Sequence, residues 1–193
     1  MNILIQNGRV IDPKNSVDRS TSLYVADGKV AALGEAPAGF VADQTIDAAG
    51  CVVCPGLIDL GARLNSIEAE LAAAVAGGVT SVVVPPDADP PLDEPELADR
   101  LVHRGTEIGK ARVLPLGALT LGLNGERLAE LAGLKKAGCV AFSQANRPVT
   151  DTEALLRAME YAATFGFAIW LQPQDYWLSR NGIAHEGEVS SRL

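Results

Sequence analysis

The chain has 193 residues, 48% of them hydrophobic and 21% charged, which is enough apolar material for a core and excludes a disordered segment. Its net charge of −8 and isoelectric point near 4.7 exclude nucleic acid as an expected partner, because nucleic-acid-binding surfaces are basic. Three cysteines, an odd number, do not make a disulfide framework and indicate a reducing, cytoplasmic environment.

Neither a targeting segment nor a membrane-spanning segment is expected. The N-terminal stretch MNILIQNGRV lacks the basic start and apolar middle of a signal peptide. The longest uncharged run, residues 71–86, is broken by Gly77-Gly78 and ends in two prolines, which is typical of a helix followed by a strand. We therefore predict no membrane partner.

Residues 1–54 have the pattern of short β-strands. Asn7-Gly8 and Asp27-Gly28 each lie between alternating apolar and polar residues, which predicts two hairpins, and another strand or pair of strands follows from residue 44. Cys51 and Cys54 form a C-x-x-C in an apolar run with no second pair, so we expect two buried thiols rather than a metal or redox site. This part predicts a small β-sandwich or β-sheet module.

From residue 55 the period changes to alternating strands and helices. Thr150 and Glu153 have the spacing of a capping box at the start of the last helix. Such alternation predicts a parallel α/β sheet, with a doubly wound sheet and a barrel both compatible. The predicted strands cover residues 56–60, 79–84, 111–119, 139–143 and 167–172, and the predicted helices cover residues 66–78, 94–109, 125–138 and 150–166.

Four stretches in this order carry a resemblance to the dihydroorotase family of the amidohydrolase superfamily: PGLIDLGARL, AAAVAGGVTSVVVPPDADPPLD, GALTLGLNGERLAELAGLKKAGCVAFS and HEGEVSSRL. The resemblance implies a β-sandwich module over residues 1–54. Over residues 55–193 it implies the first five βα units of a (β/α)8 barrel.

The resemblance also implies where a metal site would lie, and the first family positions are occupied by unsuitable residues. The family has His-x-His at the end of the first barrel strand, where this chain has Gly61 and Arg63, neither of which is a metal ligand. Two positions further on, the family's substrate-clamping arginine is replaced by Asn65. After the second strand, Asp87 stands in place of a substrate-binding asparagine.

The remaining ligand positions are altered as well. After the fourth strand, where relatives supply a bridging carboxylate or a modified lysine, this chain offers Gln144. After the fifth strand the family's histidine is replaced by Gln172. The chain has two histidines, and we expect His103 to lie on a helix surface. We expect His185 to lie in a surface loop, with a relic of the site or a partner contact as the alternatives, and we interpret Asp59 and Asp175 as candidate relics of the site.

The resemblance and these losses together favour a non-catalytic dihydroorotase homologue of pyrimidine biosynthesis, with no catalytic residue, no metal site and no cofactor, zinc being the cofactor of active relatives. The same resemblance implies aspartate carbamoyltransferase as partner, and we also expect self-association. Two alternatives stay open: a zinc-dependent cyclic amidohydrolase with a relocated site, and a ligand-binding module without chemistry.

Overall fold

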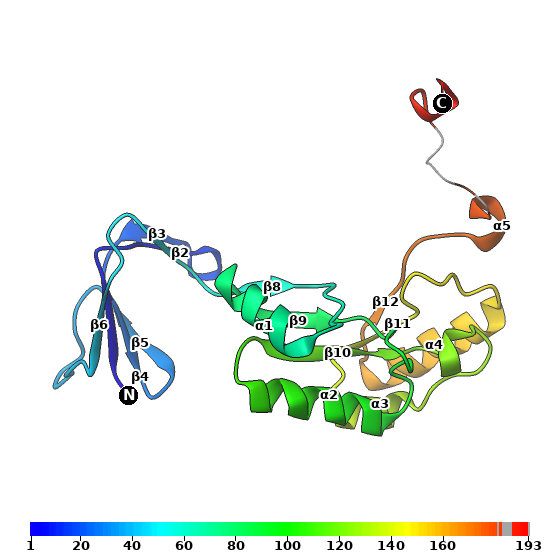
Figure 1. Ribbon diagram of the computed structural model, residues 1–193, viewed down its shortest axis with the longest axis horizontal. Helices are drawn as coiled ribbons and strands as arrows, with labels where there is room; N and C mark the ends of the chain where they lie inside the picture. Colours follow the sequence, from blue (N-terminus) through cyan, green and yellow to red (C-terminus); the bar gives the residue numbers. More distant parts are fainter. Residues whose placement is uncertain (181, 183–186, 193) are drawn as a thin grey trace. The chain divides into compact units, whose positions relative to one another are not determined.

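The computed structural model describes residues 1–180, 182 and 187–192 (Figure 1). The chain divides into two compact units, Met1–Gly56 and Leu57–Leu193, which we describe separately. Among the described residues, no helix has both the length and the apolar composition needed to cross a membrane.

The first unit consists of two small β-sheets. Its four-stranded sheet has the order β5-β4-β1-β6 and its three-stranded sheet the order β3-β2-β7. A short 3-10 turn, Pro13–Asn15, joins β2 and β3. The strands are β1 (Ile3–Gln6), β2 (Arg9–Asp12), β3 (Val17–Ser20), β4 (Leu23–Ala26), β5 (Lys29–Leu33), β6 (Gln44–Asp47) and β7 (Val52–Val53).

One of the two predicted hairpins is confirmed and the other is wrong. β4 and β5 pair antiparallel around Asp27 and Gly28, whose φ angles of 50° and 72° suit a tight hairpin turn. Asn7-Gly8 instead carries the chain from one sheet to the other, because β1 pairs with β4 and β6 whereas β2 pairs with β3 and β7. A Cβ at Gly8 would lie 2.7 Å from Val53, so this glycine is needed for close packing.

The second unit is built on a five-stranded parallel sheet that curls into a half-barrel, with the order β12-β11-β10-β9-β8. Each strand lies beside the next one in the chain, so the doubly wound alternative, in which the order reverses, is excluded. The strands are β8 (Leu57–Asp59), β9 (Val79–Val84), β10 (Arg112–Ala118), β11 (Ala141–Ser143) and β12 (Ile169–Trp170).

Four of the five helices among the described residues lie where the sequence predicts them, with two differences in their starts, whereas the short helix Tyr176–Ser179 was not predicted. The helices are α1 (Ile67–Ala76), α2 (Pro95–Ile108), α3 (Leu131–Lys136), α4 (Thr152–Phe165) and α5 (Tyr176–Ser179), with 3-10 turns at Leu121–Leu123 and Ser190–Arg192 (Figure 1). α3 is shorter than predicted, because Thr120 and Leu128 form a β-bridge ahead of it. α4 is capped by Asp151 rather than by Thr150, since the Asp151 carboxylate accepts from the Glu153 and Ala154 amides.

Alternate residues of the strands separate the two faces of this sheet. Val82 and Val84 pack with Leu71 of α1 in one apolar cluster, whereas Val83 packs with Leu116 and Ala141 in another. A third cluster, centred on Phe142, holds α2, α3 and α4. Burial on both faces explains why the second half of β9, residues 82–84, is an uninterrupted run of valines.

Candidate functional site

The carboxyl ends of the parallel strands bring several of the predicted positions to one edge of the sheet. Gly61 and Arg63 follow β8, Asp87 follows β9, Gln144 follows β11 and Gln172 follows β12. This is the edge at which barrels and open α/β sheets place their sites.

Arg63 and Asp87, both at predicted site positions, form an ion pair. The Arg63 Nε and Nη2 atoms donate to Asp87 Oδ2 at 3.1 Å and 2.8 Å. The Arg63 side chain is half exposed and that of Asp87 is 26% exposed. Asp87 Oδ1 is enclosed and has no hydrogen-bond partner among the described residues. The guanidinium thus neutralises a carboxylate that would otherwise attract a metal cation.

Asp59 and Gly61 form the turn that leaves β8. Asp59 Oδ1 accepts from the Gly61 amide at 2.9 Å, so this carboxylate supports the backbone at the strand end. A Cβ at Gly61 would meet nothing within 4 Å. Packing therefore does not require glycine here, and a histidine side chain has room to begin at this position.

Gln144 is sealed inside the unit instead of facing a cavity. Its side chain is 1% exposed, and its amide is paired with Thr120, which is equally buried. Thr120 Oγ1 donates to Gln144 Oε1 at 3.0 Å and accepts from Gln144 Nε2 at 2.8 Å. Thr120 Oγ1 also accepts from the Gly125 amide at 2.9 Å. The position is occupied by a satisfied structural contact.

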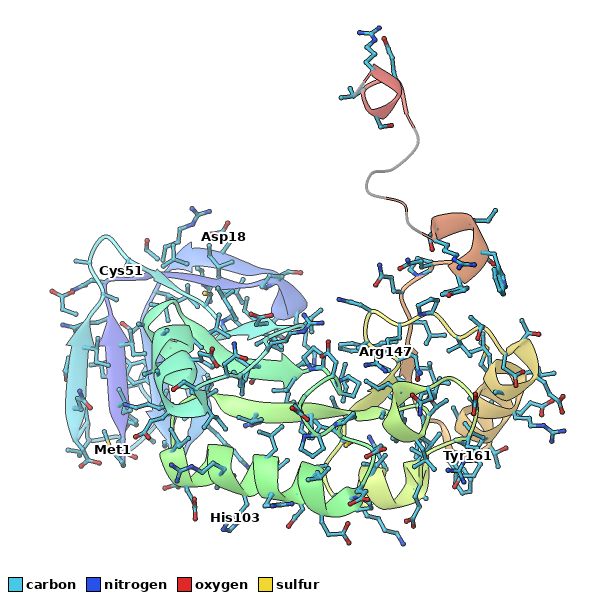
Figure 2. All side chains as sticks on the ribbon, turned by 45° about the vertical axis from the view of Figure 1, so that its right-hand side comes forward. Met1, Asp18, Cys51, His103, Arg147 and Tyr161 are labelled. Atoms are coloured by element: carbon cyan, nitrogen blue, oxygen red, sulfur yellow. The ribbon has the colours of Figure 1, made fainter. Side chains whose placement is uncertain are left out.

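The other predicted positions form no hydrogen bond or ion pair with Arg63, Asp87 or Gln144 among the described residues. Gln172 is exposed, and Asp175 caps α5 by accepting from the Trp177 and Leu178 amides. Asn65 lines a groove beside α2. His185 lies outside the described residues. His103 is exposed on α2, as predicted (Figure 2).

The residues that fix the loop after β10 were not predicted from the sequence. Asp93 Oδ2 accepts from the Gly122 amide at 2.7 Å, and Arg147 Nη1 donates to the Gly122 carbonyl at 3.3 Å. With Thr120, these contacts hold the loop against the ends of its neighbouring strands. A polar Thr120 directly after an apolar strand was the only sequence signal for this network.

The described residues do not fit the zinc that the fold family implies. No group of three or more His, Cys, Asp or Glu side chains converges among the residues with defined positions. Gly61 offers no ligand atom and Arg63 offers only donors. These residues disagree with a hydrolytic zinc centre, and no reaction step through zinc follows from them.

The cysteines also differ from expectation. Cys51 and Cys54 are exposed, contrary to their predicted burial, because β7 between them has only two residues and pairs only with β2 among the described strands. Cys139 is the buried thiol, and burial raises its pKa to about 12, with a smaller opposing effect of Lys135. At neutral pH Cys139 is therefore a protonated core residue and no thiolate ligand.

Comparison with known proteins gives one family. The family model described as Dihydro-orotase-like matches residues 50–193. A dihydroorotase-like protein of Pseudomonas putida is 46% identical over the whole of this chain and 47% of its own length, and one of Pseudomonas aeruginosa is 44% identical over 48% of its length. A protein of Pelobacter propionicus named dihydroorotase is 43% identical over 47% of its length. The chain thus spans about half the length of these relatives.

Solved structures support the fold alone. An L-hydantoinase from Arthrobacter aurescens superposes with a TM-score of 0.69 at 21% identity, over 88% of this chain and 40% of that one. A D-aminoacylase superposes with a TM-score of 0.65 at 21% identity, over 92% of this chain and 47% of that one.

Proposed function

This chain belongs to the dihydroorotase-like family, and from that premise we propose that it is a non-catalytic member acting in pyrimidine biosynthesis. The observation that carries the proposal is the ion pair between Arg63 and Asp87. By the resemblance, Arg63 stands where the family has a metal-ligating histidine, and Asp87 stands where the family has a substrate-binding asparagine.

The chemistry of zinc hydrolysis explains why this pair matters. A catalytic zinc needs neutral imidazoles or carboxylates around it and one open position for the water it activates. A guanidinium at 2.8 Å from Asp87 places a fixed positive charge where those ligands belong. The buried Thr120–Gln144 pair replaces the bridging group with an uncharged contact.

We further propose that this half-barrel is the first five strands of an eight-stranded barrel, preceded by a β-sandwich, in a cytoplasmic protein. Its role is that of a structural subunit of aspartate carbamoyltransferase. What supports the role is the family resemblance together with the loss of the site. The unpaired outer edges of β8 and β12 among the described strands support self-association or assembly.

A working cyclic amidohydrolase is the second candidate, favoured by one observation. The relative from Pelobacter propionicus that is named dihydroorotase is 43% identical to this chain. If this candidate holds, the metal site uses other residues than Gly61 and Arg63.

Metal content and turnover test the proposal. After dialysis against a weak chelator, we expect well below one zinc per chain and no cyclisation of ureidosuccinate, with the Pelobacter propionicus relative as a control. The double variant Gly61→His/Arg63→His is expected to stay inactive, because Gln144 and Gln172 still lack ligand character. Stoichiometric zinc in the unaltered chain, or clear turnover by it, would support the amidohydrolase instead. Turnover by the double variant alone would show that Gln144 and Gln172 matter less than we propose.

A further inference from the structure

A groove lies on the outer side of the half-barrel, between α2 and the segment that leads into α1. It has a volume of about 480 Å³ and is lined by Leu64, Asn65, Ile67, Arg100, Leu101, His103, Arg104 and Glu107. Both flanks belong to the same compact unit. The lining residues of α2 recur at helical spacing, so a single face of that helix forms one wall.

The floor of the groove is apolar and fixed. Leu64, Ile67 and Leu101 are half-buried, and all three pack on the cluster that contains Leu71 and Val82. A ligand seated here would contact a surface that is held in place by the core, so little of it has to be ordered on binding.

The groove is lined by two arginines and one glutamate, although the chain as a whole has a charge of −8. Arg100 is exposed and has no ion-pair or hydrogen-bond partner among the described residues. His103 lies on the outer side of α2 (Figure 2). Arg104 is held by Glu107 at 3.2 Å and by Glu68 of α1 at 3.9 Å, which ties the two walls together.

We propose that this groove docks an acidic segment of a partner protein, with an apolar side chain on the floor and a carboxylate paired with Arg100. A guanidinium without an internal partner binds carboxylates through two parallel hydrogen bonds. Asn65 adds an amide that donates and accepts at the mouth. An apolar floor with a charged rim is the arrangement of protein interfaces. The inference rests on the proposed role only in that both require a protein partner.

Fluorescence anisotropy with short labelled peptides tests the proposal on the whole chain. A peptide alternating glutamate and leucine is expected to bind, and binding is expected to weaken as salt is raised. Peptides with lysine in place of glutamate, or serine in place of leucine, are expected to bind at least about tenfold more weakly. Equal binding of the lysine peptide, or no binding of the glutamate peptide, would overturn the proposal.

Matched charge reversals locate the binding. Arg100→Glu is expected to weaken the binding of the glutamate–leucine peptide about tenfold or more, because a charge-assisted hydrogen bond becomes a repulsion. Arg127→Glu makes the same change at an exposed arginine in the loop after β10 and should leave binding unchanged. Arg100→Gln, which keeps helix propensity, should give an intermediate loss. Equal effects of Arg100→Glu and Arg127→Glu would refute the site.

Light scattering distinguishes the occupant. If Arg100→Glu dissociates an assembly of this chain with itself, the groove binds a second copy and the partner proposal fails. Unchanged self-assembly with lost peptide binding supports it. Stoichiometric zinc in a protein whose groove binds the peptide would refute the non-catalytic function and leave this inference standing.

Discussion

At the scale of single residues, several of the predicted site positions make structural contacts within the chain. Arg63 and Asp87 neutralise each other, Gln144 is satisfied by Thr120, and Asp59 supports the turn at Gly61. A carboxylate left beside an apolar strand end without a cation would be unfavourable. Arg63 therefore supplies the positive charge that balances Asp87.

We expect the Arg63–Asp87 pair to contribute modestly to stability. Arg63→Ala should lower the free energy of unfolding by about 1 kcal/mol, since the pair is partly exposed and solvent screens it. Asp87→Ala should lower the free energy of unfolding by less than Arg63→Ala does, because it also removes the enclosed Oδ1, which has no hydrogen-bond partner among the described residues. The coupling energy from a double-mutant cycle in urea should be roughly 0.5–1 kcal/mol and fall at high salt. Strictly additive single effects would show that the pair contributes nothing.

The candidate site positions were chosen from the sequence, but the contacts that their side chains make could not be read from it. Arg63 and Asp87 are 24 positions apart, and Thr120 and Gln144 are likewise 24 positions apart. Their contact depends on the parallel register of β8 with β9 and of β10 with β11, which residue identity does not encode locally.

At the scale of elements, the alternation of strands and helices was predicted well because each segment has a clear period. The errors arose where a local signal competed with a tertiary one. Asn7-Gly8 has hairpin composition, yet Ile5 and Val10 belong to strands of different sheets. The segment 125–130 has helical composition, yet the Thr120–Leu128 bridge and the Gly125 contact to Thr120 keep it out of the helix.

The start of α4 provides a test at this scale. Asp151→Ala should lower the free energy of unfolding by about 1 kcal/mol, since it removes an oxygen that accepts from two amides. Thr150→Ala is the matched control and should change stability by less than about 0.3 kcal/mol, because Thr150 is exposed and is not the cap. Urea unfolding of both variants measures the difference. A larger effect of Thr150→Ala would restore the predicted capping box.

At the scale of the whole molecule, the half-barrel presents apolar residues at both outer strands. Leu57 and Ile58 of β8 are 56% and 58% exposed, and Trp170 and Leu171 at β12 are 36% and 37% exposed. Leu156, Met159 and Phe165 on α4 are exposed as well. Neither outer strand has a neighbour on its free edge among the described strands. Exposed edges of parallel sheets and apolar patches of this kind promote association.

We therefore expect this chain, produced alone, to associate in solution. Multi-angle light scattering at low micromolar concentration should give masses well above the 20.2 kDa of one chain. Ile58→Lys and Leu171→Lys, which place a charge at each outer strand, should shift the distribution toward single chains. Lys29→Glu, at an exposed position of β5 in the other unit, serves as the control and should leave the mass unchanged. A dilute, monodisperse 20.2 kDa species would mean that the two edges are protected by the chain itself, and the outer strands would then have to pack differently from a half-barrel.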